Sequence, residues 1–291
     1  MSIEQILKQK LDRLSVVPDD FLSSLQKTEK QYYEKLLKLI AELELSQGVF
    51  VLSKANLAKL TNIEAQLKDL FLDTDFKVQV KKFIAEFDEQ AKLNAAYFKK
   101  AFPGESIPKI ADELISKKKE SVAKLLLGDN LDANFINPIR EQVELAVTSQ
   151  ASFSETLTSL QKIVTGDGET DSKIAQYAKQ VAHDTFAVSD RAYTKIVSDE
   201  LGAEWFKWSG NVIPTSRSIC VENHNKFFHR MEIEEMADKD WSGKMEGTNT
   251  ETIFTTAGGY NCRHSVLPVS INSVPQEVID RAEKKGYYVP A

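Results

Sequence analysis

The placement of glycine and proline constrains this chain more than any other feature of its sequence. From the N-terminus to about residue 201, Leu, Lys, Glu and Ala dominate, and helix-breaking residues fall at only a few sites. Such residues usually mark the ends of helices, so the sequence predicts a series of long helices over this region. The expected breaks are Pro18, Gly48, Pro103 to Pro108, Gly128, Pro138 and Gly166 to Gly168.

Apolar residues recur at helical spacing in two stretches of this region, which predicts helices with one buried face. Neither stretch keeps the strict heptads of a long coiled coil, so packing within the chain is favoured, with subunit contacts left open. The first stretch contains Leu22, Leu25, Tyr32, Leu36, Ile40 and Leu43, and the second contains Phe76, Val80, Phe83, Phe87, Ala91 and Phe98.

A further long helix is expected from Asp171 to Leu201, joining this region to the rest of the chain. Asp171 suits an N-cap, and Gly202 suits a C-terminal stop. His183 lies off the apolar face of this helix. We therefore expect its side chain to be solvated or interfacial.

The composition changes after Gly202. All three Trp, both Cys, three of the four His and half of the twelve Gly lie between Gly202 and His264. Short β-branched or aromatic runs there predict strands. The expected strands are Glu204 to Trp208, Phe227 to His229, Thr252 to Thr256 and Ser265 to Ile271. The fold class predicted is mainly α, with a helical N-terminal region (1–168), a connecting helix (169–202) and a compact α+β module with short strands (203–291).

Composition narrows the functional classes. A hydrophobic share of 42% is that of a folding chain, and the formal net charge of −6 does not favour a general nucleic-acid binder. No apolar run reaches the roughly 20 residues of a membrane span, and the N-terminus lacks a signal-peptide core. We expect no membrane contact, synthesis in the cytoplasm and reduced cysteines.

Four residues form the one constellation with metal-binding chemistry. Cys220 and His224 have C-x3-H spacing, and Cys262 and His264 have C-x-H spacing. Four such ligands suit a structural zinc ion. The C-x-H spacing is tighter than the common ligand spacings, and we expect a turn at Asn261 to His264 to bring both members of the second pair inward. Two alternatives stay open, namely buried cysteines with loop-bonded histidines, and a disulfide.

Catalytic motifs are not found in the sequence. It has no phosphate-binding glycine loop, no H-E-x-x-H helix and no G-x-S-x-G elbow. A Cys220 nucleophile with His224 or His264 as its base would have the residue types but no further site. We expect no enzyme and no catalytic residue.

Three stretches in the C-terminal third resemble the head morphogenesis family of tailed bacteriophages, the Mu F-like minor head proteins. In order they are VAHDTFAVSDRAYTKIVSDELGAEWFKWSG, TSRSICVENHNKFF and GGYNCRHSVLPVS. The family's C-x-x-C corresponds to Cys220 and Asn223 with His224 next to it, and its closing H-P-x-C-R-C corresponds to GYNCRH. His264 thus replaces a Cys, an exchange common among metal ligands, while Gly259 and Tyr260 replace the family's His and Pro.

The resemblance implies a structural virion protein that is present in several copies inside the phage head, near the portal. Its partners would be the portal protein and the major capsid protein, and it would act in head assembly or in DNA packaging or ejection. The lysine runs Lys81 to Lys82, Lys99 to Lys100 and Lys117 to Lys119 suggest contact with packaged DNA, but the acidic net charge favours ordinary solvated helix faces. The alternatives are an effector or toxin domain, such as an ADP-ribosyltransferase, and a zinc-stabilised nucleic-acid-binding module.

Overall fold

A computed structural model of the chain describes residues 1–289. The fold is mainly α, and a small antiparallel sheet lies in the C-terminal region, as the composition predicts. None of the helices in the described range combines the length and apolar character that a bilayer span requires.

The chain divides into two compact units. We call residues 18–84 and 120–182 the helical unit, and residues 1–17, 85–119 and 183 onward the sheet unit. The consecutive ranges expected from sequence, 1–168, 169–202 and 203–291, differ from this division. The reason is that four long helices contribute residues to both units, so that neither unit is one continuous stretch. They are α1 (Ile3–Ile40), α3 (Phe76–Ala101), α4 (Ile110–Leu127) and α8 (Lys173–Glu200).

The helical unit also contains shorter elements. They are the hairpin β1 (Leu45–Ser46) and β2 (Val49–Phe50), and the helices α2 (Lys54–Leu72), α5 (Asp129–Leu131), a π-helix (Asp132–Ile136), α6 (Asn137–Thr148) and α7 (Phe153–Thr165). The expected breaks at Gly48 and Gly166 are confirmed, since Gly48 lies in the hairpin turn and Gly166 ends α7, both with positive φ.

The expected break at Pro18 is wrong, because Pro18 lies inside α1. An interior proline removes one backbone hydrogen bond and costs about 3 kcal/mol. The apolar stripe continues on both sides of it, with Leu14, Val17, Phe21 and Leu25 buried, and this burial outweighs the lost bond. Pro138 also breaks nothing, since it lies in the first turn of α6, where proline is tolerated.

Aromatic rings fill the core of the helical unit. Tyr32 of α1 meets Phe71 of α2 edge-on at 5.1 Å between ring centroids, and Phe71 lies 4.6 Å from Phe76 and 4.7 Å from Phe135. All four rings are almost fully buried. Tyr32 and Phe76 come from the two stripes predicted from helical spacing, whereas Phe71 and Phe135 do not.

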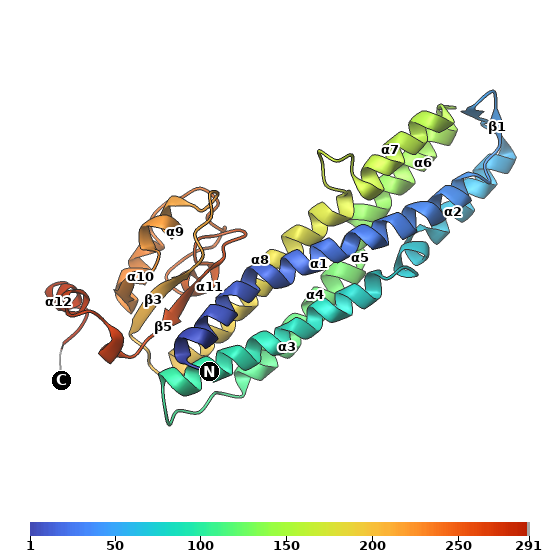
Figure 1. Ribbon diagram of the computed structural model, residues 1–291. Helices are drawn as coiled ribbons and strands as arrows, with labels where there is room; N and C mark the ends of the chain where they lie inside the picture. Colours follow the sequence, from blue (N-terminus) through green and yellow to red (C-terminus); the bar gives the residue numbers. More distant parts are fainter. Residues whose placement is uncertain (290–291) are drawn as a thin grey trace. The chain divides into compact units, whose positions relative to one another are not determined.

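The sheet unit is built around three strands in the order β4-β3-β5, all antiparallel. Its elements after α8 are β3 (Trp205–Gly210), α9 (Ser218–Asn223), β4 (Phe227–His229), α10 (Arg230–Met236), α11 (Ile253–Thr256), β5 (His264–Pro268), a 3-10 turn (Ile271–Ser273) and α12 (Gln276–Lys284). Figure 1 shows β3 and β5 side by side, with α9, α10 and α11 near them.

Side chains alternate across β3 and supply two cores. Phe206 and Trp208 join a core with Cys220, Cys262 and residues of α10 and α11. Trp205 points to the other face, where Val278 and Ala282 of α12 cover it. The register pairs Trp208 with Val266 and Gly210 with His264, which places the start of β5 against the end of β3.

The strand expected at Thr252 to Thr256 is wrong, because Ile253–Thr256 is the short helix α11. Its β-branched residues favour a strand, but the side-chain oxygen of Asn249 accepts the backbone N–H groups of Glu251 and Thr252 and starts a turn. The backbone N–H of Ile253 then donates to the Asn249 carbonyl at 2.9 Å. Local capping overrides propensity here.

Helix α8 ends where the sequence predicts, but its N-cap lies one residue after the expected one. Ser172, and not Asp171, accepts the backbone N–H of Ala175 on its hydroxyl, at 3.0 Å. At the other end, Gly202 has φ 59°, its N–H donates to Asp199, and the Ala203 N–H donates to Ser198. This is a complete Schellman motif, which explains the glycine.

A buried charged network fixes the interior of the sheet unit. The Asp190 carboxylate of α8 accepts hydrogen bonds from Lys10 Nζ at 2.6 Å, Gln90 Nε2 at 2.9 Å, Asn94 Nδ2 at 3.0 Å and Ser265 Oγ at 3.1 Å. The Lys10 and Asp190 side chains are both fully buried. The network therefore ties α1, α3, α8 and β5 together within this unit.

Candidate metal centre

Cys220 is brought into the core of the sheet unit by the short helix α9. Its backbone N–H donates to the Arg217 carbonyl at 2.9 Å, which forms the first turn. Its side chain packs with Trp208 and Phe254 and is only 2% exposed. The sulfur is thus an interior group.

A turn before β5 brings Cys262 and His264 to the same side. Asn261 has φ 54°, and its backbone N–H donates to the Asp184 carboxylate at 2.6 Å. The backbone N–H of His264 donates to Cys262 Sγ at 3.4 Å. Cys262 lies outside β5, and the turn expected at Asn261 to His264 is present.

Arg191 of α8 stabilises this turn through hydrogen bonds to its backbone. Its guanidinium donates to three carbonyl oxygens, those of Thr255 at 2.5 Å and of Cys262 and His264 at 3.0 Å each. The residue is 1% exposed. One buried arginine therefore fixes the backbone of two candidate ligands, a role that sequence spacing did not reveal.

Three of the four candidate ligands lie close enough together to hold a metal ion. The two Sγ atoms are 3.7 Å apart, Cys262 Sγ lies 4.0 Å from His264 Nδ1, and the ligand atoms of Cys220, Cys262 and His264 all lie within 4.8 Å of one another. Zn–S bonds of ~2.3 Å at tetrahedral angles place two sulfurs ~3.8 Å apart, and an S–N pair at ~3.6 Å. Three residues could therefore hold a metal ion after small side-chain shifts.

The fourth predicted ligand, His224, lies beside this group but outside it. Its ring centroid is 5.9 Å from that of His264, with the two planes nearly perpendicular. Its Nε2 is 2.8 Å from Asn225 Nδ2, while its Nδ1 is buried without a hydrogen-bond partner, as is Nε2 of His264. His224 follows α9 directly, and it is not among the residues whose ligand atoms lie together.

The pKa values of the two thiols are shifted in opposite directions. Cys262 accepts a hydrogen bond from Cys220, which lowers the pKa of Cys262 well below its usual value, and His264 and the charge of Arg191 act in the same direction against burial. The same hydrogen bond raises the pKa of Cys220, as does its burial. Burial lowers the pKa of His224, and the nearby His264 and Lys207 add to the effect. A thiolate and neutral imidazoles are the forms that bind zinc.

Gly258 provides the space above the two sulfurs. A Cβ at this position would lie 2.2 Å from Cys220 Sγ and 2.9 Å from Cys262 Sγ. No side chain fits there without displacing the thiols. Gly258 is visible in the sequence as the first residue of a GG pair. The need for a glycine there comes from its contact with Cys220, which is distant along the chain.

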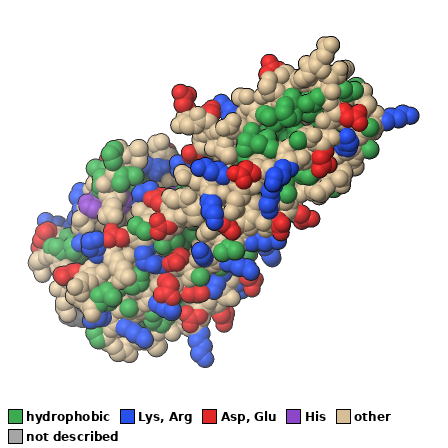
Figure 2. Space-filling model, turned by 45° about the vertical axis from the view of Figure 1, so that its right-hand side comes forward, with side chains coloured by type: hydrophobic (Ala, Val, Ile, Leu, Met, Phe, Trp, Pro, Cys, Tyr) green, Lys and Arg blue, Asp and Glu red, His purple; other side chains and the backbone are tan. Residues whose placement is uncertain are grey.

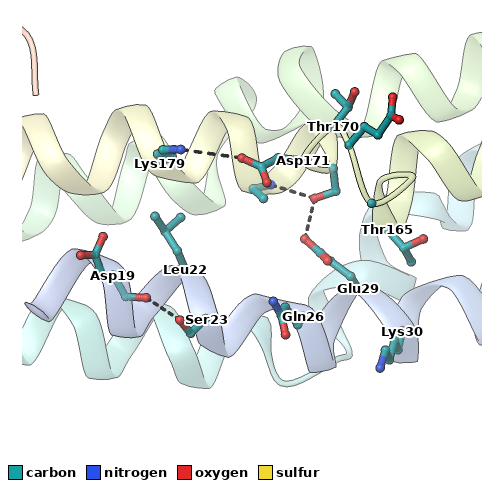
Figure 3. A pocket seen from close by; sticks show the side chains of 14 residues that line it. Asp19, Leu22, Ser23, Gln26, Glu29, Lys30, Thr165, Thr170, Asp171 and Lys179 are labelled. Atoms are coloured by element: carbon teal, nitrogen blue, oxygen red, sulfur yellow. Dashed lines mark hydrogen bonds and ion pairs between the residues drawn. The ribbon is translucent and has the colours of Figure 1, made fainter. Parts of the chain in front are cut away.

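A second candidate is an open cavity of about 580 Å³ in the helical unit, between α1 and the start of α8. Figure 3 shows its charged lining, with Lys179 beside Asp171 at 3.8 Å and Asp19 on the opposite wall. Glu29 accepts a hydrogen bond from Ser172 at 2.5 Å, and burial raises the pKa of Glu29. The lining contains no Cys or His and mixes both charges, so it defines no reaction or ligand class.

His183 is not solvated, contrary to expectation. It is only 6% exposed, next to Asp184, whose carboxylate holds the Asn261 turn. The periodicity of α8 is broken by buried polar residues that make tertiary contacts, including Asp190 and Arg191. An apolar stripe alone could not identify the faces of such a helix.

Comparison with protein-family models, curated proteins and solved structures found no significant match to this chain. The functional conclusions therefore depend on the residues themselves.

Proposed function

We propose that this chain is a structural minor head protein of a tailed bacteriophage, whose sheet unit is stabilised by a zinc ion. The carrying observation is that the three stretches that resemble the Mu F-like family meet at one place. The first supplies Arg191 and Trp208, the second supplies Cys220, and the third supplies Cys262 and His264. Motif order along the chain is thus matched by proximity in space.

The burial of the cluster favours a structural metal over a catalytic one. Cys220, Cys262 and His264 are 2%, 5% and 2% exposed. Structural zinc sites are closed by four protein ligands, whereas catalytic sites keep a position open to water or substrate. The zinc would connect α9 to the turn before β5, two segments that are far apart along the chain, and add its binding energy to folding.

We assign Cys220, Cys262 and His264 as the first three ligands and His224 as the fourth. His224→Ala should then speed zinc loss to a competing chelator, because a three-ligand site binds less tightly. Lys226→Ala is the matched control, since Lys226 is exposed in the same loop. Equal rates of zinc loss in both variants would remove His224 from the site.

The portal protein and the major capsid protein are the proposed partners, and several copies would enter each head. Packaged DNA is a weaker candidate. On the face that Figure 2 displays, Lys and Arg are interspersed with Asp and Glu. Lys119, in one of the lysine runs, forms an ion pair with Asp88 at 2.6 Å. Such a surface has no continuous basic track for a nucleic-acid backbone.

The test is to purify tailed particles from the strain that encodes the chain and to quantify the chain by mass spectrometry in DNA-filled heads. We expect several copies per head, and fewer in particles complemented with Cys262→Ser than in those complemented with Lys226→Ala. A chain that is expressed but absent from the heads would overturn the proposal.

A further inference from the structure

The two cysteines are close enough for a second chemistry. Their sulfurs lie 3.7 Å apart, in contact but not bonded, and a disulfide requires ~2.05 Å. Cys220 sits on α9 and Cys262 in the turn before β5, so rotation of either side chain could change this distance without moving β3 or β5. Gly258 carries no Cβ, so both sulfurs can lie together in the space beside it.

We propose that Cys220 and Cys262 are a redox pair that closes into an intramolecular disulfide when the metal is absent and a hydroperoxide is present. The pair is the only cysteine pair in the chain. The inference concerns the metal-free protein and so holds whether or not zinc is the resident ion.

The chemistry balances with hydrogen peroxide as the oxidant. The sulfur of Cys262, which accepts a hydrogen bond from the His264 backbone N–H, attacks one peroxide oxygen. The O–O bond breaks, a sulfenic acid forms, and hydroxide leaves as water with the thiol proton. The Cys220 sulfur then attacks the Cys262 sulfur, the S–O bond breaks, and the second hydroxide leaves with the Cys220 proton. Two thiols are oxidised and one peroxide becomes two waters.

Metal and disulfide exclude each other at this site. Zinc needs both sulfurs as separate thiolate ligands, while the disulfide joins them and removes their negative charge. Zinc should therefore protect the pair, and oxidation should prevent zinc from rebinding. Because both cysteines are buried, the oxidant can reach them only when the turn at 258–264 opens. A bound metal would keep this turn closed.

The pair has a consequence that rests on the proposed function. A head protein is made in a reducing cytoplasm and leaves it when the host cell lyses. Outside, thiols near each other oxidise readily. The disulfide would then keep α9 joined to the turn before β5 after any loss of metal.

The experiment uses the full chain, stripped of metal by chelator and treated with hydrogen peroxide with and without added zinc. Near-ultraviolet circular dichroism of the tryptophans verifies that the metal-free chain is folded. We expect free thiols to fall from two to none, a mass loss of about 2 Da, and a peptide linking Cys220 to Cys262. In the folded chain the disulfide should be the main product, whereas in concentrated urea, where the sulfurs are separated, a larger share of the protein should carry over-oxidised thiols.

Cys220→Ser and Cys262→Ser are the controls, and each should gain oxygen on its remaining sulfur without losing 2 Da. Disulfide formation in the folded metal-free chain that zinc suppresses would support the redox pair and the metal site together. Disulfide formation that zinc does not slow would support the redox pair and contradict the metal site. Over-oxidation of separate thiols, or a disulfide yield no higher than in urea, would overturn the proposal.

Discussion

Gly258 matters because of the missing Cβ and not because of its backbone conformation. The two sulfurs occupy the space that a side chain would need, at 2.2 Å and 2.9 Å from the Cβ position. Gly247, in contrast, has φ +76° and open space around it. Substitutions at these two glycines therefore distinguish the steric cost of an added Cβ from the cost of a left-handed backbone conformation.

Gly258→Ala should destabilise the protein by about 1–3 kcal/mol, the usual cost of overpacking, and should lower its zinc content. Gly247→Ala should cost about 1 kcal/mol through its backbone conformation and leave zinc content unchanged. Urea unfolding and elemental analysis of both variants measure the two effects. Full zinc occupancy in Gly258→Ala would show that the thiols can move aside.

Asp190 is the residue whose charge should matter most for stability. Burial alone would raise its pKa, but the charge of Lys10 and hydrogen bonds from Lys10, Gln90 and Asn94 outweigh burial and lower the pKa. A carboxylate with a lowered folded-state pKa stabilises the fold above its unfolded pKa of ~3.9. That contribution is lost as the pH falls through the lower folded-state value.

Asp190→Asn should therefore cost about 3–5 kcal/mol at pH 7, because Lys10 would be left as an unpaired buried charge. The difference from the wild type should shrink as the pH falls below about 4, where the carboxylate of the unfolded wild type takes up a proton, and should go on shrinking down to the lower folded-state pKa. Urea unfolding at several pH values tests both points. Glu89→Gln, in the exposed pair with Lys92, is the control and should change little. A constant difference across this pH range would contradict the assignment.

At the scale of elements, the sequence predicts well what local patterns determine. The helices with apolar stripes, the stop of α8 at Gly202, and the strands β4 and β5 follow from spacing and capping residues. Pro18 was misjudged because burial on both sides keeps α1 continuous. The stretch from Thr252 was misjudged because Asn249 starts a turn that overrides β-branched composition.

Gly202 allows a direct test at this scale. Its φ of 59° is left-handed, and no atom lies near its Cβ position, so a substitution there is opposed only by the backbone. Gly202→Ala should lower stability by about 1 kcal/mol, and Gly202→Asn by less, because Asn tolerates this conformation. Thermal melting of both variants measures the difference. Equal melting temperatures for wild type and Gly202→Ala would mean that α8 can end in another way.

At the scale of the whole molecule, the features that the sequence did not predict depend on contacts between residues far apart along the chain. The types of Cys220, Cys262 and His264 indicated that they could lie together, and the turn before His264 was expected, whereas His224 lies outside their group. Arg191, Asp184 and Gly258 were not recognised, because each acts on residues far along the chain. The division into units also escaped prediction, since long helices contribute to both.

The central claim is that the Cys and His cluster holds a zinc ion that stabilises the sheet unit. Its most direct test is elemental analysis of the full chain, purified without added zinc, with thermal melting before and after chelation. The account predicts about one zinc per wild-type chain, nearly none in Cys262→Ser, and a lower melting temperature after the metal is removed. A wild-type chain without metal, whose melting neither zinc nor chelator changes, would contradict it.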